Sequence, residues 1–247
     1  MLERSAKLSA IPGLTHGFSN RTGGVSSGRF ASLNLGFKWG DDPEAVRENL
    51  RRVAEAGGYA PSDLRRVKQV HGGEVLRATS LTEASEADGL WCTRDDGLTV
   101  AVSTADCIPL LLADEAGTVA AAVHSGWRST VACIAEHAVE ALGVDPSSLV
   151  AAIGPCIELA AFEVGPEVAS QFDAAFVDAR TYAKPHVDLV GVVTAQLQRA
   201  GVRAENIERV GGCTHALEER YFSYRRDGAG TGQMMSFVGF ASERTNA

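Results

Sequence analysis

Cys107 and His124 stand at the two ends of a predicted β-hairpin, where a thiol and an imidazole could share a metal ion or act as a nucleophile and its base. Residues 108–113 and 118–123 are apolar, strand-like runs, and the polar, glycine-bearing segment between them predicts a four-residue loop. If the two residues that flank this loop pair with each other, Cys107 lies opposite His124. Residues opposite one another in antiparallel strands have Cβ atoms about 4.5–5.5 Å apart, which suits either chemistry.

His71 is the third residue of this kind, because it ends the strand-like run in VKQVHGG and precedes a glycine pair that exposes its imidazole. With Cys107 and His124 it forms a candidate site (the trio) of one thiolate and two imidazoles, which leaves a fourth metal position for water, as in catalytic zinc sites. The alternative is a cysteine hydrolase in which His124 or His71 activates Cys107. Both alternatives require a neighbour that favours the thiolate, because an unassisted thiol has a pKa of about 8.5. The separations of 36 and 17 residues match no compact zinc motif.

Two arginines are candidate contacts for an anionic substrate. A helix predicted to begin in SGWRST places Arg128 and free backbone N–H groups beside His124, and such a helix N-terminus attracts anions such as phosphate. Arg225, in YFSYRRDGAGTGQ, either contacts substrate or belongs to a solvated charge pair.

Other polar residues of the motifs are candidates for supporting roles. Asp106, directly before Cys107, and Asp88, in EADGL, are candidate acid–base groups or groups that orient a ligand. Gln69, in VKQVHG, is a further candidate contact for substrate or phosphate. Cys156, in AIGPCIE, follows a strand-like run and either approaches a cleft or is buried.

Helix and strand signals alternate along the chain. Capping residues, apolar residues at helical spacing and terminal glycines predict helices at 43–57, 127–142, 166–176 and 189–200. Apolar runs predict strands at 66–70, 98–103, 149–153, 207–210 and 234–240, besides the two of the hairpin. Because the hairpin is antiparallel while helices separate other strands, we expect an α/β or α+β fold with mixed sheets.

Composition limits the classes of partner and the location. The 247 residues, which we expect to form one domain, carry a net charge of −8. This charge disfavours a general nucleic-acid binder, because phosphate-backbone affinity requires a dense basic surface. The N-terminus lacks the apolar core of a secretion signal, and no run approaches the about 20 apolar residues that span a bilayer, so we expect a cytoplasmic protein without a membrane partner. Five cysteines in such a chain predict reduced thiols.

Motifs occur in a characteristic order along nearly the whole chain. They are GFSNRTGGVSSGRFASLNLG, VKQVHG, ADGL, TADCIPLLLAD, VHSGWRST, IGPCI, FEVG and YFSYRRDGAGTG. In these motifs and their order the chain resembles the YfiH or laccase-domain family, also described as a family of multifunctional purine nucleoside phosphorylases. The resemblance implies a layered α/β fold, a zinc site on the trio, and phosphorolysis of adenosine, inosine, guanosine or methylthioadenosine together with deamination of adenosine.

Two positions depart from the family pattern. Ser129 follows GWR where glycine is common, and Gln233 follows TG where arginine is common. The missing arginine would remove part of an anion or substrate contact and leave the trio intact.

The family suggests two other activities. A multicopper oxidase needs many copper-binding histidines, several in His-x-His pairs, whereas this chain has six histidines and no such pair. A single Cu²⁺ at the trio stays an alternative to Zn²⁺, because Cu²⁺ binds most nitrogen and sulfur sites more tightly. A copper-dependent polyphenol oxidase is therefore one alternative function. The other is an amidase that edits peptidoglycan precursors with Cys107 as its nucleophile.

The sequence therefore predicts a zinc-dependent enzyme, a purine nucleoside phosphorylase and adenosine deaminase, that is, a glycosyltransferase and a hydrolase. Its partners are purine nucleosides and phosphate, and no oligomeric state is predicted. The predicted roles are metal binding for the trio, contact with phosphate or substrate for Arg128, Arg225 and Gln69, and acid–base or orienting assistance for Asp106.

Overall fold

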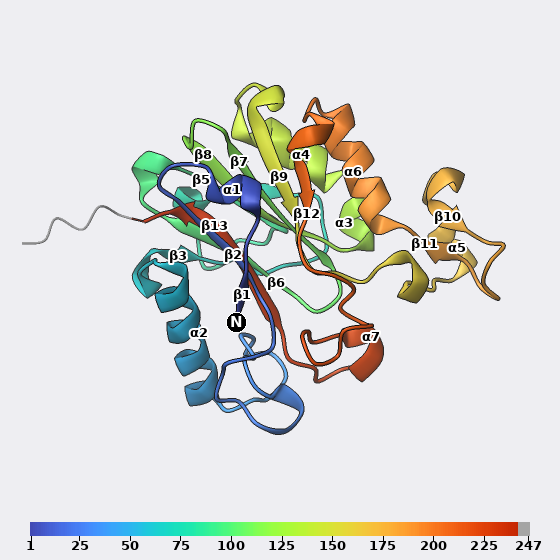
Figure 1. The fold of residues 1–247 in the computed structure, drawn as a ribbon, viewed down its shortest axis with the longest axis horizontal. Coiled ribbons are helices and arrows are strands. Elements are labelled where there is room, and N and C mark those ends of the chain that lie inside the picture. The colour runs from blue at the N-terminus through green and yellow to red at the C-terminus, as the bar shows by residue number, and fades with distance from the viewer. Residues whose placement is uncertain (242–247) are drawn as a thin grey trace, which may run out of the picture.

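Two β-sheets packed face to face form the centre of the computed structural model, which describes residues 1–241 (Figure 1). The larger sheet has the order β12 (Ile207–Arg209), β9 (Leu149–Ile153), β7 (Ile108–Asp114), β8 (Val119–Ser125), β5 (Gly89–Thr93) and β4 (Val75–Arg77). The smaller sheet has the order β1 (Leu2–Glu3), β2 (Leu14–Ser19), β13 (Met234–Phe240), β6 (Thr99–Thr104) and β3 (Leu64–Arg65). A separate ribbon pairs β10 (Val177–Asp178) with β11 (His186–Val187).

Helices cover the outer face of each sheet. α4 (Ile134–Leu142) and α6 (Leu189–Arg199) pack on the six-stranded sheet, and α2 (Pro43–Gly57) packs on the five-stranded sheet. The remaining α-helices are short: α1 (Ala6–Ser9), α3 (Trp127–Val131), α5 (Pro166–Ala169) and α7 (Tyr224–Asp227). Both sheets combine parallel and antiparallel neighbours, so the predicted α/β class with mixed sheets is confirmed.

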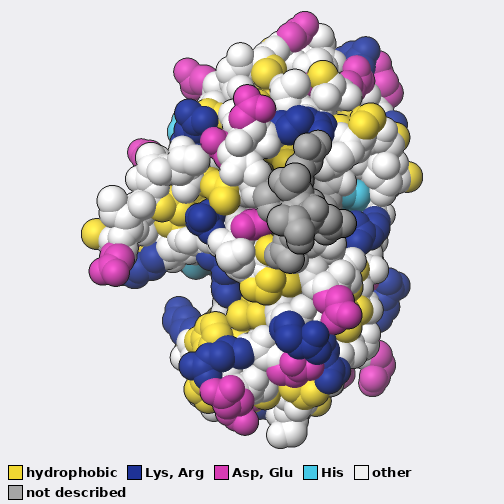
Figure 2. Space-filling view, turned by 90° about the vertical axis from the view of Figure 1, so that its left-hand side faces the viewer, with side chains coloured by type: hydrophobic (Ala, Val, Ile, Leu, Met, Phe, Trp, Pro, Cys, Tyr) yellow, Lys and Arg dark blue, Asp and Glu magenta, His cyan; other side chains and the backbone are white. Residues whose placement is uncertain are grey.

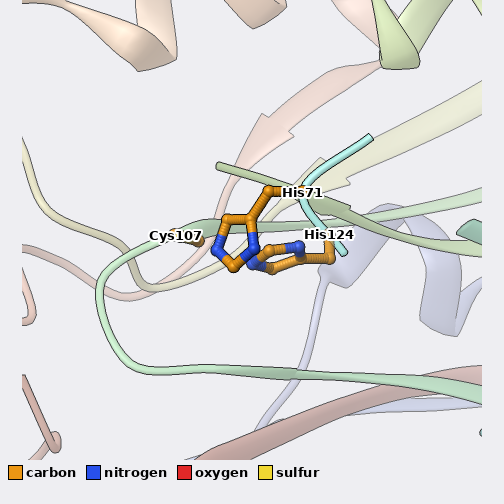
Figure 3. Close-up of side chains that lie close together, drawn as sticks. All are labelled: His71, Cys107 and His124. Carbon is orange, nitrogen blue, oxygen red and sulfur yellow. The ribbon is translucent and has the colours of Figure 1, made fainter. Parts of the chain in front are cut away.

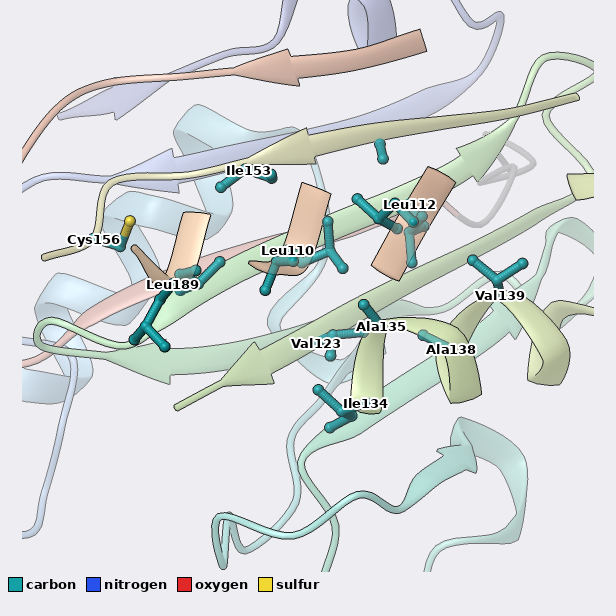
Figure 4. Close-up of a cluster of buried hydrophobic side chains, with 14 of the residues drawn as sticks. Leu110, Leu112, Val123, Ile134, Ala135, Ala138, Val139, Ile153, Cys156 and Leu189 are labelled. Carbon is teal, nitrogen blue, oxygen red and sulfur yellow. The ribbon is translucent and has the colours of Figure 1, made fainter. Parts of the chain in front are cut away.

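Alternate side chains of the central strand β7 face two different hydrophobic clusters. Leu110 and Leu112 pack among residues of α4 and α6 (Figure 4), whereas Leu111 and Ala113 pack between the two sheets. Successive side chains of a strand point to opposite faces, so a strand that is covered on both faces is apolar throughout. This double burial explains the unbroken apolar run on which the hairpin prediction rests.

The predicted hairpin is present, but its register differs from the prediction by two residues. His124 pairs with Pro109 and not with Cys107. The carboxylate of Asp114 accepts hydrogen bonds from the backbone N–H groups of residues 118–119 at 2.6 and 2.9 Å, so the chain turns one residue later than predicted. A shift of two residues leaves every side chain on its predicted face, and the trio therefore still converges.

Two of the four predicted helices are confirmed by α2 and α6. The predicted helix at 127–142 is divided into α3 and α4, because Cys133 has φ 56°, a left-handed conformation that interrupts a right-handed helix. The predicted helix at 166–176 keeps only α5 and a separate 3₁₀ turn at Ala174–Phe176, because the Asp173 carboxylate accepts a hydrogen bond from Ala175 N–H and starts a new turn.

The predicted strand at 66–70 is wrong, since β3 ends at Arg65 and only Lys68 makes an isolated bridge. The side chain of Gln69 explains the difference. Its amide donates to the carbonyl of Ser103 at 2.9 Å and accepts from the N–H of Ser103 at 2.8 Å. The side chain of Gln69 therefore makes hydrogen bonds with the backbone N–H and C=O groups of β6 that the backbone of a neighbouring strand would otherwise make.

The visible surface carries charges of both signs. Figure 2 shows Lys and Arg side chains interspersed with Asp and Glu on one face of the molecule, without a continuous basic tract. Within residues 1–241, no helix has both the length and the apolar composition needed to cross a bilayer.

Candidate metal centre and active site

His71, Cys107 and His124 converge from three separate segments (Figure 3). His71 lies in the loop between β3 and β4, Cys107 in the bend between β6 and β7, and His124 near the end of β8. One nitrogen or sulfur atom from each lies within 4.8 Å of those of the other two. The side chain of His124 is buried while His71 is exposed, so the trio opens to solvent on the side of His71.

The donor atoms of the trio fit a metal ion. Tetrahedral zinc has bonds of about 2.0–2.3 Å, which put neighbouring ligand atoms roughly 3.5 Å apart. The two imidazole rings are edge-to-face, with centroids 4.8 Å apart and planes at 87°, so both can aim a nitrogen at a common point. The three side chains could therefore hold zinc with small adjustments of their rotamers.

Asp88 holds both histidines with one carboxylate. Its Oδ1 lies 2.7 Å from Nδ1 of His124, and its Oδ2 accepts hydrogen bonds from the N–H groups of Val70 and Gly72, on either side of His71. Asp88 is fully buried and directly precedes β5. Carboxylates that orient metal-binding histidines in this way are a common part of metal sites. The remaining nitrogen of His124 is thereby left to face Cys107.

Burial and charge act in opposite directions on this cluster. Burial alone would raise the pKa of Cys107, but the charge of His124 and hydrogen bonds with both imidazoles lower it to about 6. Burial would likewise lower the pKa of His124, whereas the Cys107 thiolate and Asp88 raise it to about 9. Burial would raise the pKa of Asp88, but hydrogen bonds from His124 and Gly72 lower it overall. The neighbour that favours a thiolate at Cys107 is therefore His124.

Gly126 provides the space in which the three side chains meet. It directly follows Ser125, which pairs with Ile108, so the observed register places Gly126 opposite Cys107. A Cβ atom at Gly126 would lie 3.1 Å from Sγ of Cys107 and 3.0 Å from Cδ2 of His71. Gly126 has φ −75°, which any residue adopts, so the glycine is needed here for space and not for its backbone freedom.

Gly126→Ala is expected to weaken metal binding by about tenfold without unfolding the protein, because the added methyl group crowds two of the three ligands. Gly72→Ala is the matched control, since its Cβ would make only ordinary contacts of 3.7 Å. Titration of both variants with zinc in competition with a chromogenic chelator measures the effect. Equal affinities for the two variants would contradict it.

Asp106 ties the bend before Cys107 to two other loops. Its carboxylate accepts hydrogen bonds from Oγ1 of Thr214 and from the backbone N–H of Arg225, both at 2.6 Å, and its carbonyl accepts one from Ile157 N–H at 2.8 Å. Asp106 is buried and has φ 99°, a conformation that non-glycine residues rarely adopt. These contacts show how the bend is held, and an acid–base role for Asp106 stays a prediction.

The three predicted substrate contacts lie in different settings. Arg128 is exposed at the start of α3, with its guanidinium 4.2 Å from the centroid of the Trp127 ring. The guanidinium of Arg225 donates to the carbonyls of Ala161 and Glu163 at 3.3 and 2.8 Å. Gln69 is held by β6, as described above. Of the three, Arg128 is the one nearest to His124 in the sequence, and it is exposed.

Asp88 was predicted from the sequence as a candidate for orienting a ligand, but the groups that it contacts and the role of Gly126 were not predicted. Asp88 was only one of several carboxylates, and nothing in EADGL indicates that its two oxygens serve different histidines. The glycine of HSGW was a sequence signal for Gly126, because a glycine directly after a ligand strand often marks a close approach of other groups.

The chain is similar to several bacterial proteins. Residues 15–241 match the family described as multi-copper polyphenol oxidoreductase laccase. A Deinococcus radiodurans protein named purine nucleoside phosphorylase is 40% identical over 241 residues, which cover 93% of this chain and 89% of that protein. Purine nucleoside phosphorylase YfiH of Escherichia coli is 40% identical over 225 residues, which cover 89% of this chain and 91% of that protein.

Two solved structures share the fold over nearly the whole chain. A Neisseria meningitidis protein assigned to DUF152 has a TM-score of 0.86 and 32% identity, covering 98% of this chain and 99% of its own. YlmD of Geobacillus stearothermophilus has a TM-score of 0.85 and 29% identity, covering 94% of both chains.

Proposed function

The chain belongs to the family described as multi-copper polyphenol oxidoreductase laccase, and we propose that it is a purine nucleoside phosphorylase whose active site is the trio. The names of its relatives support the reaction class. The observation that supports the site is the convergence of three metal-ligand side chains around Gly126, with Asp88 holding both histidines. We further propose that the metal is zinc and that the same site deaminates adenosine.

Phosphorolysis makes defined demands on the chain. An oxygen of phosphate bonds to the anomeric carbon of ribose, the bond from that carbon to the purine nitrogen breaks, and the purine leaves with a proton. The protein must align the two reactants and stabilise the charge that develops. Zinc held by the trio would supply a Lewis acid. Asp88 orients the imidazole of His124 and holds the backbone on either side of His71, and Arg128 attracts the phosphate.

The test is product analysis. Zinc-loaded protein is incubated with adenosine, and separately with inosine, guanosine and methylthioadenosine, each with and without phosphate, and the products are separated by chromatography. Phosphorolysis of adenosine yields adenine and ribose 1-phosphate only when phosphate is present. Deamination of adenosine yields inosine and ammonia with or without phosphate. Intact adenosine, inosine, guanosine and methylthioadenosine under all conditions would refute the proposed phosphorylase.

Arg128→Ala is expected to raise the KM for phosphate about tenfold, since a charge-assisted hydrogen bond contributes about 1.5–3 kcal/mol. The variant should keep its fold, because Arg128 is exposed and contacts only the Trp127 ring among the interactions described above. Arg47→Ala on the exposed face of α2 is the matched control for the loss of one positive charge. Normal phosphate kinetics in Arg128→Ala would remove this residue from the anion site.

One observation favours a second candidate, an amidase. Cys107, His124 and Asp88 form the series of thiol, imidazole and carboxylate that activates a cysteine nucleophile, and the lowered pKa of Cys107 fits that role. Metal-free protein incubated with a peptidoglycan-precursor amide tests it. Release of an amino acid without metal, together with unreacted adenosine in zinc-loaded protein, would favour the amidase.

The copper oxidation in the family description has less support. Among residues 1–241, the trio is the one cluster of three or more metal-ligand side chains close enough to share an ion. Oxidation of polyphenols by several coppers requires more than one such cluster. We therefore do not propose this activity.

A further inference from the structure

Cys156 and Cys213 are two buried thiols that the proposed reactions do not use. Cys156 follows β9 at the edge of the helix-covered cluster, where Figure 4 shows its sulfur, and it is fully buried. Cys213 is 9% exposed and lies in the segment after β12. The two residues form a parallel β-bridge, in which Thr214 N–H donates to the carbonyl of Cys156 at 2.9 Å.

The bridge brings the cysteines within the reach of a disulfide. Neighbouring strands lie about 4.8 Å apart. A disulfide joins residues with Cα atoms about 4.4–6.8 Å apart. Paired residues of adjacent strands also direct their side chains to the same side of the sheet. Rotation about the two Cα–Cβ bonds can therefore turn the sulfurs toward each other, and a small shift of the two segments closes the remaining gap without a change of fold.

The residue after each cysteine holds Asp106. Ile157, after Cys156, donates its backbone N–H to the carbonyl of Asp106 at 2.8 Å. Thr214, after Cys213, donates its hydroxyl to the carboxylate of Asp106 at 2.6 Å. Asp106 directly precedes Cys107, so the two cysteine segments together support the bend that carries a member of the trio.

We propose that Cys156 and Cys213 are an oxidation site, at which an intramolecular disulfide forms and weakens metal binding by displacing Asp106 and Cys107. The bond requires the two segments to move slightly closer, because a disulfide holds its Cβ atoms about 3.5–4.5 Å apart, whereas those of directly paired residues lie about 4.5–5.5 Å apart. The formation of the disulfide is independent of the proposed function, whereas its effect on the metal rests on it.

The oxidant is a small-molecule disulfide such as glutathione disulfide. The thiolate of the less buried Cys213 bonds to one sulfur of the oxidant and releases one thiolate. Cys156 then bonds to the sulfur of Cys213 and releases the second. The two protein thiols lose two protons and two electrons, and the oxidant becomes two thiols. Burial raises the pKa of Cys156 to about 12, and the Arg209 guanidinium, which donates to its sulfur at 3.3 Å, opposes that rise.

The first experiment maps the bond. Zinc-loaded full-length protein is equilibrated with mixtures of glutathione and glutathione disulfide, quenched in acid, alkylated and digested without reduction for mass spectrometry. We expect a peptide pair linked through Cys156 and Cys213, which disappears in Cys156→Ser and in Cys213→Ser but persists in Cys133→Ser. Two alkylated thiols at the most oxidising ratio, or a link from Cys213 to Cys107, would overturn the proposal.

The second experiment measures the effect on the metal. A chromogenic chelator follows zinc release from wild-type protein and from Cys156→Ser, each before and after oxidation. We expect oxidation to accelerate release several-fold in the wild type and not in the variant. Equal rates before and after oxidation, with the disulfide shown to be present, would overturn the coupling. If reduced wild type binds no zinc at all, the proposed metal site fails while the peptide mapping still decides whether the disulfide forms.

Discussion

Cys107→Ala is expected to lose its bound metal and to slow phosphate-dependent cleavage of adenosine by more than about 100-fold. Loss of a residue that merely orients a ligand lowers metal affinity or activity about 10–100-fold, and loss of a ligand itself should have a larger effect. The two imidazoles that remain come from an exposed loop and a buried strand, and two ligands hold zinc poorly without a third. Elemental analysis and product chromatography measure the two losses.

Cys133→Ala is the control for Cys107→Ala. Cys133 is a partly buried free thiol at the start of α4, so its removal tests the effect of losing a thiol as such. This control should keep both metal and activity. Unchanged metal content in Cys107→Ala would remove Cys107 from the metal site, and unchanged cleavage would remove it from the reaction.

The second large effect is expected for Asp88→Asn, which should lower zinc affinity about 10–100-fold. The substitution keeps the shape of the side chain and removes its charge. An amide offers one oxygen and one NH₂ group, so it cannot accept hydrogen bonds from His124 on one side and from the N–H groups of Val70 and Gly72 on the other. Either Nδ1 of His124 loses its acceptor, or the backbone around His71 loses the acceptor for its N–H groups.

Asp114→Asn separates this effect from a general loss of stability. Asp114 is also a buried aspartate, at the opposite end of the same hairpin, and its carboxylate accepts hydrogen bonds from two backbone N–H groups of the loop. Both variants should lower the urea midpoint of unfolding, but only Asp88→Asn should release zinc to a competing chelator. Equal zinc affinity in the two variants would show that Asp88 supports the fold and not the metal.

The trio could be predicted from the sequence because its signals are local. Two apolar runs and a polar loop predict the hairpin, and Cys107 and His124 flank those runs. The predicted register was wrong by two residues because the turn depends on the carboxylate of Asp114, yet an even shift keeps each side chain on its face. The site therefore requires that each side chain lie on the correct face of the sheet, and it does not require one particular pairing of residues.

Features that depend on distant contacts could not be predicted in the same way. No strand was predicted at residues 14–19, but His16 lies in β2, is 1% exposed and accepts a hydrogen bond from Ser5 N–H at 3.0 Å. A strand at 66–70 was expected from its apolar residues, but the side-chain amide of Gln69 makes the hydrogen bonds to Ser103 that a strand would have made. In both cases a side chain satisfies backbone groups that are remote in sequence, and hydrophobic periodicity carries no information about such pairs.

The lengths of the outermost strands have a consequence for self-association. The long apolar strands β7 and β8 are the kind of segment that forms intermolecular cross-β structure when it is exposed. Each sheet instead ends on strands of two or three residues, namely β12 and β4 in one and β1 and β3 in the other. Such short edges offer a second chain few unpaired N–H and C=O groups. The native fold therefore protects its most aggregation-prone sequence by placing it in the middle of the sheet, and fibril formation should require unfolding first.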